Sequence, residues 1–131
     1  MKKVIILAVL TATVFYLAAC GGMVTVGSFK SNIYTQEEFD EAVAVVQDYF
    51  KGFEGCTMKE IKYAGDDATE QEAQAQGMDA NQVIVLESTF ETDGENHENG
   101  LEPNKTYEGY KWILTRPASG AAWEHKDHGY G

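Results

Sequence analysis

This sequence contains few of the residues that cross-link or stiffen a chain. Its 131 residues include two cysteines, two prolines and a single arginine, Arg116. Two cysteines are too few for a small scaffold built on several disulfides. The chain also lacks a Gly-x-Ser-x-Gly, a phosphate-binding loop, a dinucleotide fingerprint and a His-Glu-x-x-His. These absences exclude the commonest signatures of serine hydrolases, nucleotide-binding enzymes and zinc proteases.

Long apolar runs are missing as well. The apolar run Val4 to Leu17 is broken only by Thr11 and Thr13, and it is too short for a membrane-spanning helix, which needs ~20 apolar residues. The stretch follows Lys2 and Lys3 and ends in small residues. A charged start, a short apolar stretch and small residues before a cleavage point are typical of a secretory signal peptide. The sequence therefore predicts a leader over residues 1–19.

Cys20 follows directly after this leader. The tetrapeptide Leu17-Ala18-Ala19-Cys20 resembles the lipobox of bacterial lipoproteins, which implies cleavage before Cys20 and a diacylglycerol on its thiol. Two or three acyl chains anchor a protein stably, because each buried CH₂ contributes ~0.8 kcal/mol. The sequence thus predicts a protein anchored by lipid at Cys20 to the extracytoplasmic face of the cell membrane. The alternative is a secreted protein with a coincidental cysteine.

The other cysteine, Cys56, has no intramolecular partner if Cys20 carries lipid. We then expect Cys56 to be a small buried residue beside Phe53, as free cysteines commonly are. A Cys20–Cys56 disulfide would require that the lipid be absent.

Basic residues are scarce. The chain has 21 acidic and 10 basic residues and a net charge of −11, and loss of Lys2 and Lys3 with the leader lowers the charge to −13. Phosphate backbones and anionic headgroups repel such a surface. We therefore expect no nucleic-acid partner and no peripheral lipid binding, whereas cations, basic peptides and neutral ligands are left open.

A helix predicted over residues 35–53 is the clearest element. Thr35 and Glu38 have the spacing of a capping box, and Gly52 and Gly55 offer a left-handed stop. Apolar residues at spacings of three and four form one stripe, which we expect to be core. The stripe consists of Phe39, Ala42, Val43, Val46, Phe50 and Phe53.

The remaining chain predicts mainly strands. Residues 21–31 form either a loose tether or, in part, an extra edge strand. Strands are expected over residues 57–64, 83–90, 107–116 and 121–128. A short exposed helix is expected over residues 66–76, held by propensity more than by burial, and residues 93–105 are expected to be a loop.

One capped helix followed by several strands predicts an α+β domain. We expect the helix to lie across the concave face of a curved antiparallel sheet. The sequence shows no internal repeat and no alternation of strands and helices that would indicate βαβ units. The predicted organisation is a leader at 1–19, a lipidated cysteine and tether at 20–33, and a single domain at 34–131.

Three stretches resemble a domain of unknown function found in short lipoproteins of Gram-positive bacteria. They are residues 53–57, residues 100–107, and residues 112–116 together with the ending from Trp123 to Gly131. The resemblance covers about residues 34–131. It implies a cystatin-like or nuclear transport factor 2-like fold, but it carries no known activity and assigns no catalytic residue.

The loop at residues 93–105 collects possible metal ligands. These are Asp93, Glu95, His97, Glu98, Asn99 and Glu102. A calcium loop of the common kind needs a glycine at its sixth position, where this loop has Glu98. We therefore expect a solvated acidic loop, no metal site and no cofactor.

His125, Asp127 and His128 form the only histidine-rich segment. On a regular strand, residues three apart point to opposite faces, so the two histidines are not expected to converge on zinc. His125 and Asp127 would share a face with Trp123, and a carboxylate can orient an imidazole for acid–base catalysis. A solvated strand end is the alternative that we prefer.

The predicted sheet is rich in aromatic residues. Most of them are expected in the core, while a few, with Tyr110, Trp112 and Trp123 as candidates, line a cleft at the open end of the sheet. Arg116 stands at a strand end beside them and pairs with a carboxylate, either of the protein or of a ligand.

These observations favour a non-enzymatic module that binds an unidentified small molecule or protein. One alternative is a small enzyme of the nuclear transport factor 2-like fold that uses His125 and Asp127 in a sheet pocket. Another is an inhibitor-like or immunity-like protein, whose acidic surface would suit a basic target.

Overall fold

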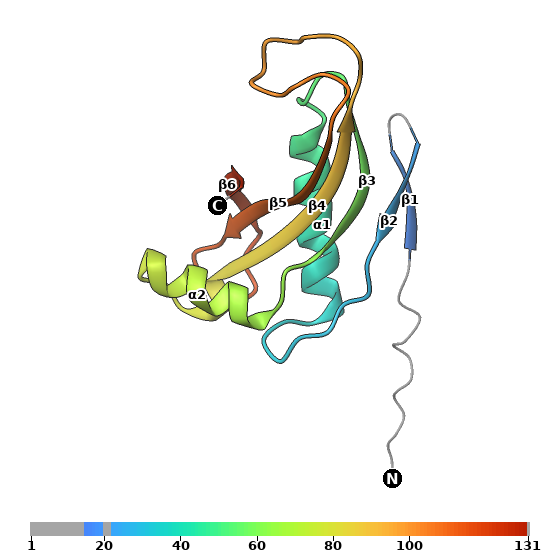
Figure 1. Cartoon of the computed structure of the whole chain (residues 1–131). Helices are drawn as coiled ribbons and strands as arrows, with labels where there is room; N and C mark the ends of the chain where they lie inside the picture. The colour runs from blue at the N-terminus through green and yellow to red at the C-terminus, as the bar shows by residue number, and fades with distance from the viewer. Residues whose placement is uncertain (1–14, 20–21, 131) are drawn as a thin grey trace.

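The structure, a computed structural model, describes residues 15–19 and 22–130. Its elements follow one another along the chain and form one six-stranded sheet with two α-helices (Figure 1). They are β1 (Phe15–Ala19), β2 (Gly22–Val26), α1 (Gln36–Phe50), β3 (Cys56–Tyr63), α2 (Asp66–Gln76), the 3₁₀ turn η3 (Ala80–Gln82), β4 (Val83–Thr92), β5 (Thr106–Thr115) and β6 (Glu124–Gly129). The sheet order is β1-β2-β3-β4-β5-β6. The expected α+β class is confirmed.

The start of α1 is the predicted one. Thr35 is the N-cap, its hydroxyl accepts from the Glu38 N–H, and the Glu38 carboxylate accepts from the Thr35 N–H. This reciprocal pair satisfies two of the amides that a helix start leaves unpaired. The helix ends at Phe50, three residues earlier than expected, and Lys51 caps it with right-handed backbone. Of the two glycines expected to stop the helix, Gly52 and Gly55, only Gly55 has left-handed backbone, with φ +74°.

The pairing of β2 corrects the predicted sheet. β2 lies parallel to β3, with Thr25 opposite Glu60 and Val26 opposite Ile61, and α1 connects the two strands. This is a βαβ unit, although the sequence pattern indicated none. The pattern did not indicate it because β2 has only five residues. It lies in residues 21–31, for which we expected either a loose tether or an extra edge strand. All other strand pairs are antiparallel.

Three irregularities bend the antiparallel part of the sheet. The register shifts between Met58 and Glu60 in β3, between Ser88 and Phe90 in β4 opposite β5, and between Ile113 and Leu114 in β5 opposite β6. An extra residue in one strand of a pair bends it and increases its twist. In Figure 1, β3, β4 and β5 curve over α1, which lies behind them.

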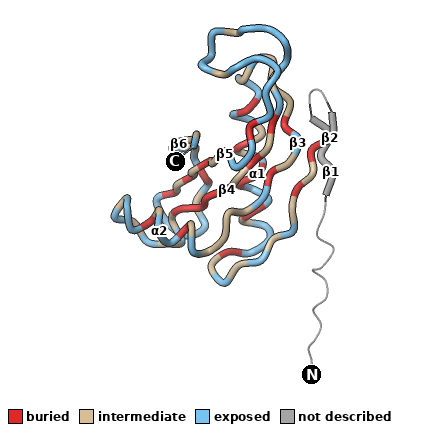
Figure 2. Tube along the Cα trace, in the orientation of Figure 1, coloured by how far each residue is buried: buried red, intermediate tan, exposed pale blue. Residues whose placement is uncertain are grey.

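The core lies between α1 and the inner face of this sheet (Figure 2). The predicted stripe is buried there at Phe39, Ala42, Val43, Val46 and Phe50, and Phe53 packs against it from beyond the end of the helix. Val24 and Val26 of β2 belong to the same cluster. Burial of these side chains supplies most of the stability of the fold, because each Å² of apolar surface removed from water contributes ~25 cal/mol.

The second helix has the predicted bounds and is mostly exposed or half-buried, as expected, with only Thr69 and Ala73 buried. It packs on the outer face of the sheet, where Ala73 meets Val83 and Val85 in a small second core, and the hydroxyl of Thr69 accepts a hydrogen bond from the Val85 N–H. This second layer explains why β4 is buried on both faces at its start.

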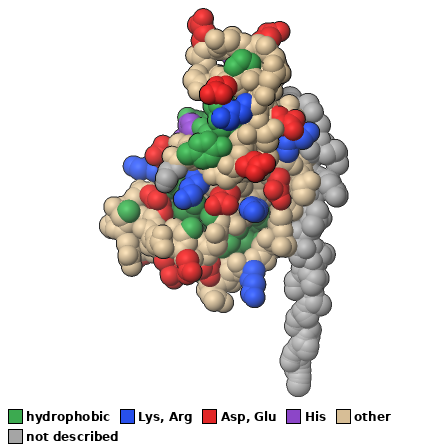
Figure 3. All heavy atoms as spheres, in the orientation of Figure 1, with side chains coloured by type: hydrophobic (Ala, Val, Ile, Leu, Met, Phe, Trp, Pro, Cys, Tyr) green, Lys and Arg blue, Asp and Glu red, His purple; other side chains and the backbone are tan. Residues whose placement is uncertain are grey.

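The charged side chains cover the outside of this body. Figure 3 shows acidic and basic side chains interspersed over the sheet face in view and acidic ones at the tip of the β4–β5 loop. Cys56 is half-buried against the core, and burial, with the charge of Asp93, raises the pKa of its thiol. This environment matches the small packed residue that was expected there.

The predicted leader and its lipid lie largely outside this description. Residues 1–14 and Cys20 are not among the described residues, and β1 occupies the last five positions assigned to the leader. Within residues 15–19 and 22–130, no helix has both the length and the apolar character required to cross a bilayer.

Candidate functional site

A cleft opens at the end of the sheet where α1 stops, and we call it the aromatic cleft. It has a volume of about 440 Å³, which is within the size range of small-molecule sites. Its walls come from the end of α1, from the β4–β5 loop and from β5 and β6. The lining residues are Tyr49, Gly52, Phe53, Asn99, Leu101, Tyr110 and His128.

Four rings form the walls of the aromatic cleft. The Phe53 ring centroid lies 6.5 Å from that of Tyr49, 6.4 Å from that of Tyr110 and 5.4 Å from that of His128. Phe53 and Tyr110 stand at 88° to one another. Rings that meet edge to face in this way gain attraction beyond their buried area. The walls are therefore a packed and preformed arrangement.

Tyr110 reaches the cleft because β5 is irregular. Tyr107 and Tyr110 are three residues apart, yet both face α1, since the register shift opposite Ser88 and Phe90 falls between them. Gly109 takes φ +68° there, a conformation that glycine adopts without strain. Tyr110 is only 8% exposed, and burial raises the pKa of its phenol. Among the described residues its hydroxyl has no hydrogen-bond partner.

Trp112 lies beneath the cleft and does not line it. Its side chain is fully buried, its ring centroid is 5.5 Å from that of Phe53, and its indole N–H donates to the Ser88 hydroxyl over 2.8 Å. The Ser88 hydroxyl in turn donates to the Tyr110 carbonyl. Trp112 thus supports the cleft from the core, which is a different place from the binding position expected for it.

His125 and His128 lie on the same side of β6, contrary to the expectation from a regular strand. Leu114 is opposite His125, Trp112 is opposite His128, and the extra residue between the two pairs is Lys126. This bulge turns both imidazoles toward α1, with His125 Nε2 2.9 Å from His128 Nδ1. The ring of His125 also stacks on Tyr49 at 3.8 Å. Burial, and then the neighbouring His128, lower the pKa of His125.

The same bulge separates His125 from Asp127. Asp127 is opposite Ile113, which faces the outer side of the sheet, and it is exposed. Its carboxylate accepts from the His128 backbone N–H. The expectation that His125, Asp127 and Trp123 share one face is therefore wrong for Asp127. No carboxylate among the described residues hydrogen-bonds either imidazole of the pair.

Arg116 and Trp123 form a separate cluster at the start of α1. The Arg116 guanidinium is buried, pairs with the Glu38 carboxylate at 2.8 Å and lies over the Trp123 ring at 4.2 Å. The Trp123 indole N–H donates to the Glu38 carbonyl. Arg116 therefore pairs with a carboxylate of the protein, which is one of its two expected partners. Arg116 and Trp123 both connect β5 and its following turn to the start of α1, and neither lines the cleft.

The β4–β5 loop is held onto the turn after α1 by His97. His97 Nε2 lies 3.0 Å from the Asp93 carboxylate, and its Nδ1 lies 3.7 Å from that of Glu54. The hydrogen bond with Asp93 raises the pKa of His97. A Cβ on Gly55 would collide with the His97 ring, so glycine is required at this approach. The loop therefore keeps Asn99 and Leu101 at the rim of the cleft.

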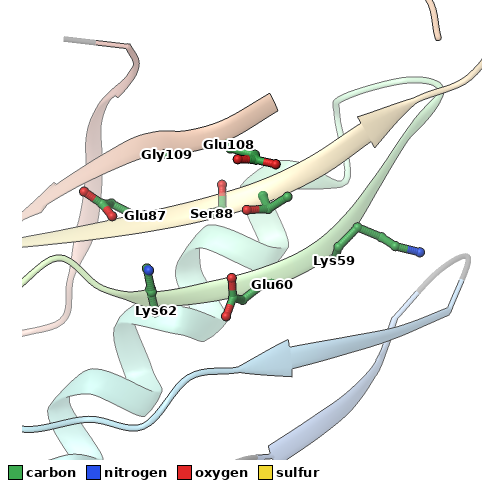
Figure 4. Close-up of a pocket in the computed structure, with 8 residues that line it drawn as sticks. Lys59, Glu60, Lys62, Glu87, Ser88, Glu108 and Gly109 are labelled. Atoms are coloured by element: carbon green, nitrogen blue, oxygen red, sulfur yellow. The ribbon is translucent and has the colours of Figure 1, made fainter. Parts of the chain in front are cut away.

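A second hollow, of about 520 Å³, lies on the outer face of the sheet (Figure 4). It is lined by Lys59, Glu60, Lys62, Glu87, Ser88, Thr89, Glu108 and Gly109. Lys62 is opposite Glu87 in the register, and Glu87 is opposite Lys111. Neighbouring charges of opposite sign and the lack of any aromatic wall are typical of a solvated sheet face, so the aromatic cleft is the better candidate site.

Of the candidate binding residues, only Tyr110 lines the cleft. Sequence reasoning missed Tyr49 and Leu101, considered Asn99 and His128 only as possible metal ligands, and assigned Phe53 to the core alone. One signal for Tyr49 was present in the sequence, because it stands four residues before Phe53 and beside the apolar stripe. In the structure the Tyr49 side chain is 44% exposed.

Comparisons with protein-family models, with curated proteins and with solved structures give no match to this chain.

Proposed function

We propose that this protein is a lipid-anchored extracytoplasmic module that binds a ligand in the aromatic cleft without chemical conversion. The observation that carries the proposal is the cleft itself, which has a volume of about 440 Å³ and preformed aromatic walls, with the Tyr110 hydroxyl unpaired among the described residues. A mainly apolar hollow with a few polar groups is typical of small-molecule sites. A bound molecule would hydrogen-bond the Tyr110 hydroxyl in place of water, and the surrounding rings would bury its apolar part.

The proposed anchor would determine which end of the domain faces the membrane. Since β2 runs parallel to β3, Gly22 lies at the end of the sheet where β3 begins, and the β4–β5 loop and the end of α1 lie at this end too (Figure 1). Gly22 is two residues after Cys20, a reach of ~7 Å. A lipid on Cys20 would hold the cleft end of the domain close to the membrane surface.

The fold adds a further argument. One long helix packed on a bent sheet is the arrangement implied by the resemblance to short Gram-positive lipoproteins, and we propose the cystatin-like or nuclear transport factor 2-like type on this basis. The separation of His125 from Asp127 removes the acid–base pair on which the enzymatic alternative depended. This favours a binding module over an enzyme.

Blocking the cleft tests binding. Gly52 is exposed, has no left-handed φ, and a Cβ there would meet only the Tyr49 carbonyl at 3.6 Å, so Gly52→Phe should fold and fill the cleft. Ala44→Phe adds the same ring at an exposed position of α1. In ligand-observed NMR with a library of small fragments, we expect hits on the parent chain and on Ala44→Phe that Gly52→Phe loses. Hits that persist in Gly52→Phe would contradict the proposal.

Anchoring has its own test. Cys20→Ala should move the protein from the membrane fraction to the soluble fraction, and the mass of the mature parent chain should include the lipid. A parent chain of unmodified mass would overturn the lipid anchor without affecting the test of the cleft.

A further inference from the structure

We infer that the aromatic cleft selects an organic cation: a quaternary ammonium or protonated amine group, free in solution or carried on a larger molecule. The inference rests on the proposed function and names the ligand class of the same site. It follows from the geometry of the rings, from the charge of the lining and from the charge of the surrounding surface.

Phe53 forms a corner with its neighbours, since it stands at 88° to Tyr110 and at 66° to Tyr49. Tyr110 and His128 stack on each other instead, at 25° and with their ring centroids 6.0 Å apart. A flat aromatic ligand is best held between two parallel rings, whereas steeply inclined rings present a face and neighbouring edges around a compact group. A tetrahedral ammonium group fits such a corner, and the negative face of each ring attracts its positive charge.

The lining provides no counter-charge for an anion. None of its residues is a lysine or an arginine, and His128 is the single lining residue that can become positive. Asn99 and the Tyr110 hydroxyl offer oxygen atoms that can accept hydrogen bonds. A carboxylate or phosphate would leave water without a fixed cation to meet it, at a high cost in free energy.

The surroundings are negative. The whole chain carries −11, and the loop that forms the rim contains Glu95, Glu98 and Glu102 on its exposed side. The field of such a surface raises the local concentration of cations and repels anions. The negative surface and the aromatic rings thus both favour a cation over an anion.

Three ligands of nearly equal shape test the inference: choline, its neutral carbon analogue 3,3-dimethylbutan-1-ol and the anion 3,3-dimethylbutanoate. They are titrated at pH 8, above the usual pKa of an imidazole, into the full chain in an uncharged maltoside detergent. Binding is followed by NMR and by tryptophan fluorescence, to which Trp112 beneath the cleft and Trp123 at the other end of the core both contribute. We expect choline to bind about tenfold more tightly than the alcohol and the anion not to bind.

Variants locate the effect. Phe53→Leu keeps an apolar side chain but removes a ring face, so it should reduce the preference for choline over the alcohol severalfold, while Ala44→Leu should leave it unchanged.

Equal binding of choline and the alcohol, or tighter binding of the anion, would overturn the cation inference. If the alcohol binds and Gly52→Phe abolishes its binding, the proposed function stands although the inference fails. No binding of choline would refute the inference, and the fragment experiment would then decide the proposed function separately.

A final arm distinguishes the source of the cation. The Cys20→Ala chain is mixed with vesicles of phosphatidylcholine or of an uncharged glycolipid. Sedimentation with the first vesicles alone, competed by free choline, would identify a lipid headgroup as the carrier. Binding of free choline without sedimentation would identify a soluble cation.

Discussion

The Arg116 guanidinium lies 2.8 Å from the Glu38 carboxylate, although 78 residues separate them in sequence. Arg116 also donates to the Asn81 carbonyl over 2.9 Å, and its plane covers the Trp123 ring. Glu38 meanwhile completes the capping box of α1. One ion pair therefore connects the first turn of the helix to the end of β5, at the opposite end of the core from the cleft.

Glu38→Gln should destabilise the protein by about 1.5–3 kcal/mol at pH 7, because it leaves a buried arginine without its counter-charge. Burial acts to raise the pKa of Glu38, but hydrogen bonds from the Thr35 N–H and from Arg116 outweigh it and hold the pKa below its ordinary value. A lowered carboxyl pKa contributes stability that is present above the ordinary value of 4.5 and lost as the pH falls below it. Urea unfolding at pH 7 and at pH 3 measures both effects.

Glu37→Gln is the matched control, since Glu37 is exposed in the same helical turn. It should cost only the interaction with the helix dipole, about 0.3–1 kcal/mol. A loss for Glu38→Gln that is no larger than for Glu37→Gln, or that is undiminished at pH 3, would show that the ion pair contributes little.

The main features of the fold were predictable because each depends on local pattern. The capping box at Thr35, the apolar stripe of α1 and the turn residues after β4 determine those elements within a few residues of sequence. The parallel β2 was not predictable in this way. Its pairing with β3 depends on α1 returning the chain along the sheet, which no feature of the five residues of β2 encodes.

Ser88→Ala should cost about 1–3 kcal/mol, because the indole N–H of Trp112 would be buried without an acceptor. Both side chains are almost completely buried, and the bond between them is 2.8 Å long. Combining Ser88→Ala with Trp112→Phe should cost less than the sum of the single changes, since the second removes the unpaired donor. Urea unfolding of the four proteins gives the coupling energy.

Thr89→Ala is the control for this cycle, because Thr89 is the next residue of β4 and faces the outer side of the sheet. It should change stability by no more than about 0.5 kcal/mol. Additive losses in the Ser88 and Trp112 cycle would mean that the hydrogen bond does not support the floor of the cleft.

The cleft was less predictable than the fold, and β-bulges are the physical reason. A bulge shifts by one residue the face on which all later side chains lie. At Lys126 it brings His128 to the side of His125 and sends Asp127 to the other side. At Gly109 it brings Tyr110 to the side of Tyr107. Alternation read from sequence assumes that no residue is inserted, so it grouped His125 with the wrong partner.

The stability of the protein should fall between pH 7 and pH 5 through His125. Burial and the adjacent His128 lower the pKa of His125 below the ordinary 6.5, so the unfolded chain takes up a proton more readily than the folded one. The free energy of unfolding is therefore unaffected by protonation of this residue above pH 6.5, and it decreases as the pH falls below that value. His125→Phe keeps a ring against Tyr49 but cannot be protonated, and it should make the unfolding midpoint less sensitive to pH in this range.

His97 must be separated from this effect, because its pKa is raised and its contribution has the opposite sign. The measurement is therefore made in a His97→Asn background as well. An identical pH dependence with and without His125→Phe, in both backgrounds, would exclude the buried imidazole as its source.

Removal of residues 1–19 should leave the fold intact but open one edge of the sheet. β1 pairs with all five residues of β2, with Leu17 opposite Val24 and Phe15 opposite Val26. Without β1, Val24 and Val26 keep their places in the core and β2 keeps its pairing with β3, yet the outward amides of β2 lose their acceptors. Hydrogen exchange should then become faster in β2 and stay unchanged in β4, which lies between two strands in either form. Equal exchange in β2 of the long and the short chain would show that β1 does not protect this edge, and loss of protection in β4 would show that the domain needs β1 to fold.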